Sequence, residues 1–241
     1  MAFCGLLLAS ILPAPAETVV LQNGLGNDVS DGIECVADTF ILEDRGSTNC
    51  GAENALGVGN MPDSSGKNRR ISTLMRFNLA PLAGATVTGP AKLSLTQVNT
   101  SGGTGESTFD FNVFAVSEKN ADWNEGRTHG REGEEADSTE ATWKFKAFPD
   151  TPWAGLPGLV DSGIDSDPEP VATLTFKEAD GNDHGMEIMI PASLIQRWID
   201  HPETNGGLLI AWQSGDRYLG MFRSSEYYLP ALRPKLQVDY K

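Results

Sequence analysis

The sequence predicts an all-β protein, folded as an antiparallel β-sandwich with one short helix. Turn-forming residues interrupt the chain at short intervals, with 26 glycines and 14 prolines in 241 residues, which is typical of all-β sandwiches. Several segments between the turns alternate apolar and polar residues. This alternation predicts strands with one buried face and one wet face.

The clearest predicted strand spans residues 71–79. Its odd positions should face the core together because strand side chains alternate; they are Ile71, Thr73, Met75, Phe77 and Leu79. Residues 109–115 alternate in the same way, although Phe114 and Val116 make the far side of that strand apolar too. Shorter alternating segments lie at 92–96, 174–176, 188–190, 208–212 and 236–240.

One helix is predicted, over residues 191–200, where Pro191 suits the first turn. Its apolar residues fall on one stripe: Leu194, Ile195, Trp198 and Ile199. We expect this helix to cover one end of the sandwich. Trp143 and Trp212 also occupy core-like positions in the pattern.

The N-terminus predicts export. Residues 3–12 form an apolar run of ten residues, followed by the cleavage pattern Ala14-Pro15-Ala16. We interpret residues 1–16 as a signal peptide cut before Glu17, although no Lys or Arg precedes the run. The alternative is a buried N-terminal strand. We expect residues 17–241 to form a single β-sandwich domain, secreted or displayed at the cell surface.

The apolar run is about half the length of a membrane-spanning helix. No later segment comes close to that length, so no membrane span is expected. The net charge of −15 argues against nucleic acid and anionic membranes as partners, since both select a basic face. It is compatible with the use of divalent cations.

Cys35 and Cys50 remain after cleavage of the signal peptide. An even pair in an oxidising compartment predicts a disulfide between them. Two free, buried thiols are the alternative.

The chain contains a set of short motifs, each present once, in this order: Ala37-Asp38-Thr39-Phe40-Ile41, Leu56-Gly57-Val58-Gly59, Leu74-Met75-Arg76-Phe77, Trp123-Asn124-Glu125-Gly126, Asn205-Gly206-Gly207 and Phe222-Arg223-Ser224-Ser225-Glu226. With these motifs the chain resembles the DNRLRE domain family over residues 35–241. Those domains are jelly-roll-like sandwiches of secreted bacterial and archaeal proteins. Two features depart from the family pattern: Cys50 replaces a bulky residue, and the charged loop at 124–139 is long and lacks apolar anchors.

The resemblance implies a function. Some family members are carbohydrate-binding modules attached to alginate-degrading enzymes. The resemblance therefore implies a secreted, non-catalytic module that binds a polysaccharide or cell-surface glycan. A uronate-containing glycan is one of the ligands it implies. A structural or adhesive surface protein that self-associates is the second hypothesis. A small polysaccharide lyase or hydrolase is the third, although the sequence carries no short catalytic motif.

Two sets of residues are candidates for the glycan site. Arginine can grip a uronate carboxylate with two hydrogen bonds, and the arginine candidates are Arg70, Arg76 and Arg223. Aromatic rings can stack on sugars, and the aromatic candidates are Trp123, Trp153 and Tyr227; one of Tyr227 and Tyr228 should point outward. The alternatives are arginines paired with nearby acidic residues and tryptophans packed in the core.

Structural Ca²⁺ is the one cofactor that the sequence suggests. Asp165 and Asp167 alternate in a turn and, with Asp38, offer the oxygen ligands that calcium prefers. Solvated loop carboxylates are the alternative.

Overall fold

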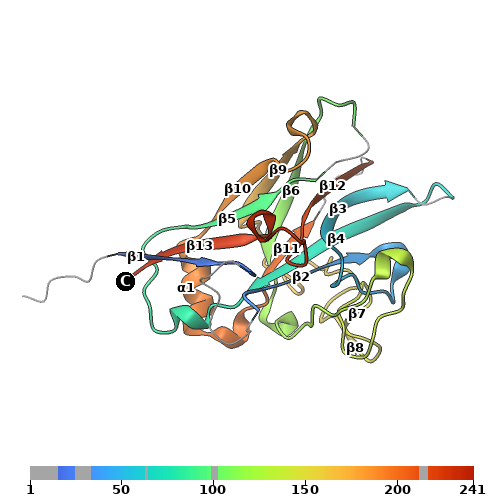
Figure 1. Cartoon of the computed structure of the whole chain (residues 1–241). Coiled ribbons are helices and arrows are strands. Elements are labelled where there is room, and N and C mark those ends of the chain that lie inside the picture. The colour runs from blue at the N-terminus through green and yellow to red at the C-terminus, as the bar shows by residue number, and fades with distance from the viewer. Residues whose placement is uncertain (1–15, 25–33, 63–64, 99–102, 212–216) are drawn as a thin grey trace, which may run out of the picture.

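A computed structural model describes residues 16–24, 34–62, 65–98, 103–211 and 217–241 (Figure 1). These residues form two antiparallel sheets, a short hairpin and one α-helix. The predicted antiparallel sandwich is confirmed. Residues 1–15 of the predicted signal peptide and the predicted core residue Trp212 lie outside the described residues.

The first sheet has four strands in the order β1–β13–β5–β10. Their bounds are β1 Glu17–Leu21, β13 Lys235–Tyr240, β5 Ala91–Thr96 and β10 Gly185–Ile190. Strand β1 pairs with β13, so the first and last described strands lie side by side, with Val19 opposite Val238.

The second sheet has seven strands in the order β12–β3–β4–β11–β6–β9, with β2 paired to β4. Their bounds are β12 Tyr218–Arg223, β3 Ala55–Pro62, β4 Asn68–Phe77, β11 Leu208–Ala211, β6 Thr108–Ala115, β9 Ala172–Lys177 and β2 Val36–Leu42. Strands β7 (Phe145–Ala147) and β8 (Thr151–Pro152) form a separate hairpin. Single-turn 3₁₀ helices lie at Glu43–Arg45, Ala80–Leu82, Glu118–Asn120, Gly130–Glu132, Glu178–Asp180, Pro202–Thr204 and Pro230–Leu232.

The main hydrophobic core lies between the two sheets. Ile71, Met75 and Phe77 of β4 share it with Leu93 and Leu236 of the first sheet. The predicted alternation of residues 71–79 is therefore confirmed. Burial of these side chains supplies the dominant favourable contribution to folding.

The second sheet is also buried on its other face, contrary to the expectation of one wet face. Ile41, Leu74, Phe114 and Leu209 project there into a second core. Its cover comes from the long irregular connection between β6 and β9, which inserts three tryptophans: Trp123, Trp143 and Trp153. The apolar far side of residues 109–116 is thus explained by this cover.

Part of that cover is the charged loop at 124–139. It was expected to lack apolar anchors, and hydrogen bonds hold it instead. The Asn49 side-chain amide donates to the carbonyl oxygens of Glu125 (2.6 Å) and Ala141 (2.9 Å), and the Asn49 carbonyl accepts from Gly130 N (2.6 Å). Buried polar groups are held firmly when they are paired in this way.

Helix α1 (Ala192–Asp200) confirms the predicted helix. The predicted stripe of Leu194, Ile195, Trp198 and Ile199 is buried in the main core. Figure 1 shows α1 beside the first sheet, near β1 and β13 and away from the β7–β8 hairpin.

The predicted Cys35–Cys50 disulfide is wrong in this structure. Both cysteines are free thiols, and both are buried in the main core, where each packs as a small apolar side chain. Burial also raises the pKa of Cys50 above its usual range, which keeps the thiol protonated and unreactive.

We therefore predict that the folded protein carries Cys35 and Cys50 as thiols. Alkylation in denaturant without reductant, followed by mass spectrometry, should label both residues. A reductant should leave the melting temperature unchanged, because no cross-link contributes the roughly 3 kcal/mol typical of a disulfide. A peptide pair joined through the two residues would contradict this prediction.

Candidate functional site

The two tryptophans proposed as sugar platforms are buried, so neither ring can stack on a sugar. Trp123 is 1 % exposed and Trp153 is 3 % exposed. Each indole N–H donates to a backbone carbonyl, Trp123 to Gly206 (2.8 Å) and Trp153 to Thr142 (2.9 Å). Both residues anchor the cover over the second sheet, so the proposed contact role is corrected to a packing role.

The first predicted arginine, Arg70, is already paired. Its guanidinium makes two hydrogen bonds to the Glu43 carboxylate, at 3.2 and 3.0 Å, and lies over the Trp143 ring at 5.2 Å. This pair lowers the pKa of Glu43. A ligand carboxylate would have to displace Glu43.

The other two arginines are held in separate places. Arg76 is partly buried over Trp123 at 4.7 Å, and its guanidinium donates to the carbonyls of Ala121 and Trp123. Arg223 pairs with Asp183 at 2.8 Å. Arg70 lines a cavity with Leu159, whereas Arg76 lines a different one with Trp198, and Arg223 lines neither. The three predicted arginines therefore do not form one site.

The two tyrosines after β12 divide as the alternation predicts. Tyr228 is 72 % exposed, whereas Tyr227 is 6 % exposed, so Tyr228 and not the proposed Tyr227 is the available ring. The two ring centroids lie 4.6 Å apart, and the Arg223 guanidinium lies 4.0 Å from the Tyr227 ring centre. We call Tyr228, with Tyr227 and Arg223 beneath it, the Tyr228 platform.

The predicted calcium ligands Asp165 and Asp167 do not lie with Asp38. The buried Asp165 carboxylate accepts four hydrogen bonds, from the Asn120 side chain (3.0 Å) and from three backbone amides at residues 155, 156 and 161 (2.8–3.0 Å). Asp167 pairs with Arg197 at 3.3 Å. These four hydrogen bonds use the acceptor capacity of the Asp165 carboxylate, so Asp165 stabilises its loop and is not free to bind a metal.

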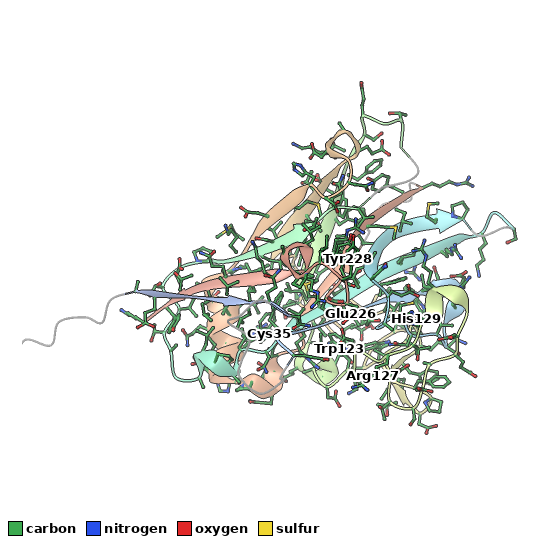
Figure 2. All side chains as sticks on the ribbon, in the orientation of Figure 1. Cys35, Trp123, Arg127, His129, Glu226 and Tyr228 are labelled. Carbon is green, nitrogen blue, oxygen red and sulfur yellow. The ribbon has the colours of Figure 1, made fainter. Side chains whose placement is uncertain are left out.

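Asp38 instead meets two glutamates that are distant in sequence. One oxygen from each of Asp38, Glu125 and Glu226 lies within 4.8 Å of the others. Ser225 links them: its backbone N–H donates to Asp38 Oδ2 (3.0 Å), and its hydroxyl donates to Glu226 Oε1 (2.7 Å). We call these three residues the carboxylate cluster. Figure 2 shows Glu226 close to Tyr228.

Each member of the cluster is positioned by its local sequence. Asp38 sits on the face of β2 that carries Val36 and Phe40, where alternation would place an apolar residue. Glu125 follows the buried Trp123, and its own carboxylate accepts from Asp38 N (2.6 Å). Glu226 ends a tight turn in which its N–H donates to Ser224 Oγ (3.2 Å).

Gly126 is required beside Glu125. Its φ of +84° lies in the left-handed region, and a Cβ there would meet the Asn49 side chain at 2.4 Å. A glycine at this position lets Asn49 hold the backbone carbonyl of Glu125.

Burial and repulsion from nearby carboxylates raise the pKa of all three carboxyl groups. Asp38, fully buried, has a pKa well above its usual range, first from burial and then from Glu226 and Glu125. Burial, followed by Glu226, raises the pKa of Glu125 to about 9. Glu226 as a whole is exposed, but partial burial of its carboxyl group, followed by repulsion from Glu34, raises its pKa. Such crowding of acids is characteristic of functional sites.

The cluster opens into an acidic cavity of about 480 Å³. Its walls are Glu34, Gly51, Ala52, Asn124, Glu125, Gly126, Arg127, Asp137, Ser138, Glu140 and Glu226. Arg127, labelled in Figure 2, is the one cationic residue in this wall. Glu140 is buried and satisfied, accepting from Arg127 N (2.6 Å), Thr128 Oγ1 (2.6 Å) and Asp137 N (2.9 Å).

Sequence reasoning identified Asp38 and missed its two partners. Glu125 and Glu226 stand inside the quoted motifs Trp123-Asn124-Glu125-Gly126 and Phe222-Arg223-Ser224-Ser225-Glu226. Each motif has a glutamate as its last or second-last residue. This shared glutamate is the feature of the sequence that could have indicated Glu125 and Glu226 as partners of Asp38.

In the part of the chain that the structure describes, no helix is both long enough and apolar enough to cross a membrane.

Comparison with known proteins yields one family. Residues 30–151, half of the chain, match the sequence model of carbohydrate-binding module family 96. The matched region includes β2, β4, the loop with Glu125 and the Asn49 anchor. No curated protein matches the chain. The match confirms that the chain belongs to a family of carbohydrate-binding modules, as the resemblance implied. The resemblance to the DNRLRE family in particular rests on the sequence motifs alone.

The different roles of the two loop aspartates can be tested by stability. Asp165→Asn should lower the free energy of unfolding by about 3 kcal/mol, because an amide NH₂ would face buried N–H donors. Asp167→Asn, the matched control, removes only an exposed ion pair and should change it by less than about 1 kcal/mol. Chemical denaturation measures both. Equal losses for the two variants would contradict this assignment.

Proposed function

The chain belongs to carbohydrate-binding module family 96, and we propose that it is an extracellular, non-catalytic module that binds a polysaccharide at the Tyr228 platform. The observation that carries the proposal is the exposure of Tyr228, whose ring is 72 % exposed. Among the described residues, it is the only aromatic side chain that is largely exposed. An exposed tyrosine ring offers an apolar face and a polar edge for contact with a ligand.

The chemistry of the platform suits a sugar. A tyrosine offers an apolar ring face for the C–H groups of a sugar and a hydroxyl for its polar edge. Leu229, 43 % exposed, extends the apolar surface beside the ring. Glu226, also exposed, adds a hydrogen-bond acceptor from the same turn.

The platform is preorganised for binding. Tyr228 lies against Tyr227, which in turn lies over Arg223, and Arg223 is fixed by two hydrogen bonds to Asp183. A ring that is already held loses little conformational freedom when a ligand lands on it.

The charges around the Tyr228 platform bear on which glycans it can bind. Arg70 and Arg223 are paired with acidic residues, and Arg76 donates to backbone carbonyls. The net charge of −15 repels polyanions at long range. These observations support a neutral polysaccharide, or a uronate-containing one bridged by a cation, over a uronate gripped directly by arginines.

Export is tested at the N-terminus. Strand β1 begins at Glu17, so the predicted cleavage before Glu17 would leave the strand complete. Expression of the full chain in a secreting host should release a protein whose N-terminal sequence begins at Glu17. Retention in the cytosol with Met1 intact would contradict the proposal.

Glycan binding is tested by removing the ring. Tyr228→Ala should weaken binding at least about tenfold, a loss of about 1.4 kcal/mol, because the central aromatic contact disappears. Tyr228→Phe keeps the ring and should retain most of the affinity. Affinity electrophoresis against neutral and uronate-containing polysaccharides, with and without CaCl₂, measures both variants.

The matched control is Met189→Ala, which truncates another exposed apolar side chain (51 % exposed) on β10 in the other sheet. It should bind as the parent protein does. Unchanged retention of Tyr228→Ala on a polysaccharide that the parent binds would refute the placement of the site.

A further inference from the structure

The carboxylate cluster contains an oxygen with no partner. Asp38 is 0 % exposed, and its Oδ1 atom has no hydrogen-bond donor among the described residues. A buried acceptor without a donor is costly and therefore rare. The two other buried carboxylates of this region differ, since Asp165 accepts four hydrogen bonds and Glu140 accepts three.

No cationic side chain neutralises the cluster. The ion pairs of the described residues include none with Asp38, Glu125 or Glu226. The ranges outside the description contain no Lys, Arg or His at all. Arg76 and Arg233 interact with Glu125 and Glu226 only at longer range, without an ion pair. No described lysine, arginine or histidine therefore makes an ion pair with any of the three carboxylates.

We propose that Asp38, Glu125 and Glu226 form a Ca²⁺ site. Three carboxylates with no nitrogen or sulfur ligand match the preference of calcium for oxygen. Calcium accepts six to eight oxygens in flexible geometry. The exposed side of Glu226 and the acidic cavity leave room for water to complete the shell.

The bound ion would join three segments that are distant in sequence: strand β2, the loop after Trp123 and the turn after β12. That turn also carries the Tyr228 platform. Calcium should therefore order the platform, a consequence that rests on the proposed function, whereas the metal site itself does not.

The test uses the full chain, freed of metal with EDTA and titrated with CaCl₂ by calorimetry. We expect one Ca²⁺ per chain, a higher melting temperature with CaCl₂ than with EDTA, and weaker binding of MgCl₂. Glu226→Gln, at the exposed edge, should weaken binding at least tenfold. Glu125→Gln should abolish the calcium-dependent rise in melting temperature.

Glu125→Gln gives a second readout in EDTA. In EDTA this variant should still unfold cooperatively, so that its loss of the calcium-dependent rise in melting temperature is not explained by a loss of the fold. Glu187→Gln is the matched control, because Glu187 is an exposed carboxylate paired with Lys92 at 3.1 Å in the first sheet. It should bind CaCl₂ as the parent does.

The proposal is overturned if CaCl₂ produces no binding heat and no change in melting temperature. It is also overturned if Glu226→Gln and Glu125→Gln bind CaCl₂ with the parent affinity. Tyr228→Ala should bind CaCl₂ normally, so a failed glycan site and a failed metal site give different results.

Discussion

The outer face of the second sheet must be kept out of water, and most other features of the molecule follow from that constraint. Ile41, Leu74, Phe114 and Leu209 make this face apolar, and among the described residues the only further sheet is the short β7–β8 hairpin. The connection between β6 and β9 covers it with irregular chain. Irregular chain leaves many backbone groups unpaired when it is buried, so the cover needs side chains that bind backbone.

Three polar side chains meet that need and so fix the cover. Asn49 holds the carbonyls of Glu125 and Ala141, Glu140 closes the loop from Arg127 to Asp137, and Asp165 gathers three backbone amides. Each is fully used by these bonds. A buried carboxylate that accepts several hydrogen bonds from N–H groups stabilises a fold. One that accepts few hydrogen bonds destabilises the fold unless it has a functional role such as binding an ion.

The sequence predicted the features that depend on local periodicity. Strand 71–79 and the helix at 191–200 were found because their apolar residues repeat along the chain. The second core was only hinted at, by Phe114 and Val116. The burial of Trp123 and Trp153 and the pairing of Arg70 with Glu43 depend on contacts between distant segments, which periodicity does not encode. Asp38, Glu125 and Glu226 are separated by 87 and about 100 positions, so only the fold brings them together.

The carboxylate cluster lies where the cover, strand β2 and the turn after β12 meet, and this position bears on recognition. Glu125 belongs to the cover, and Glu226 lies two residues from Tyr228. Without a cation, it is costly to ionise three acidic groups so close together, and their pKa values are raised for that reason. Bound Ca²⁺ would hold the three groups ionised and draw their segments together, because it attracts each carboxylate in a poorly solvated place. The acidic side chains that weaken direct binding of a polyanion would then stabilise the turn that carries the exposed Tyr228 ring.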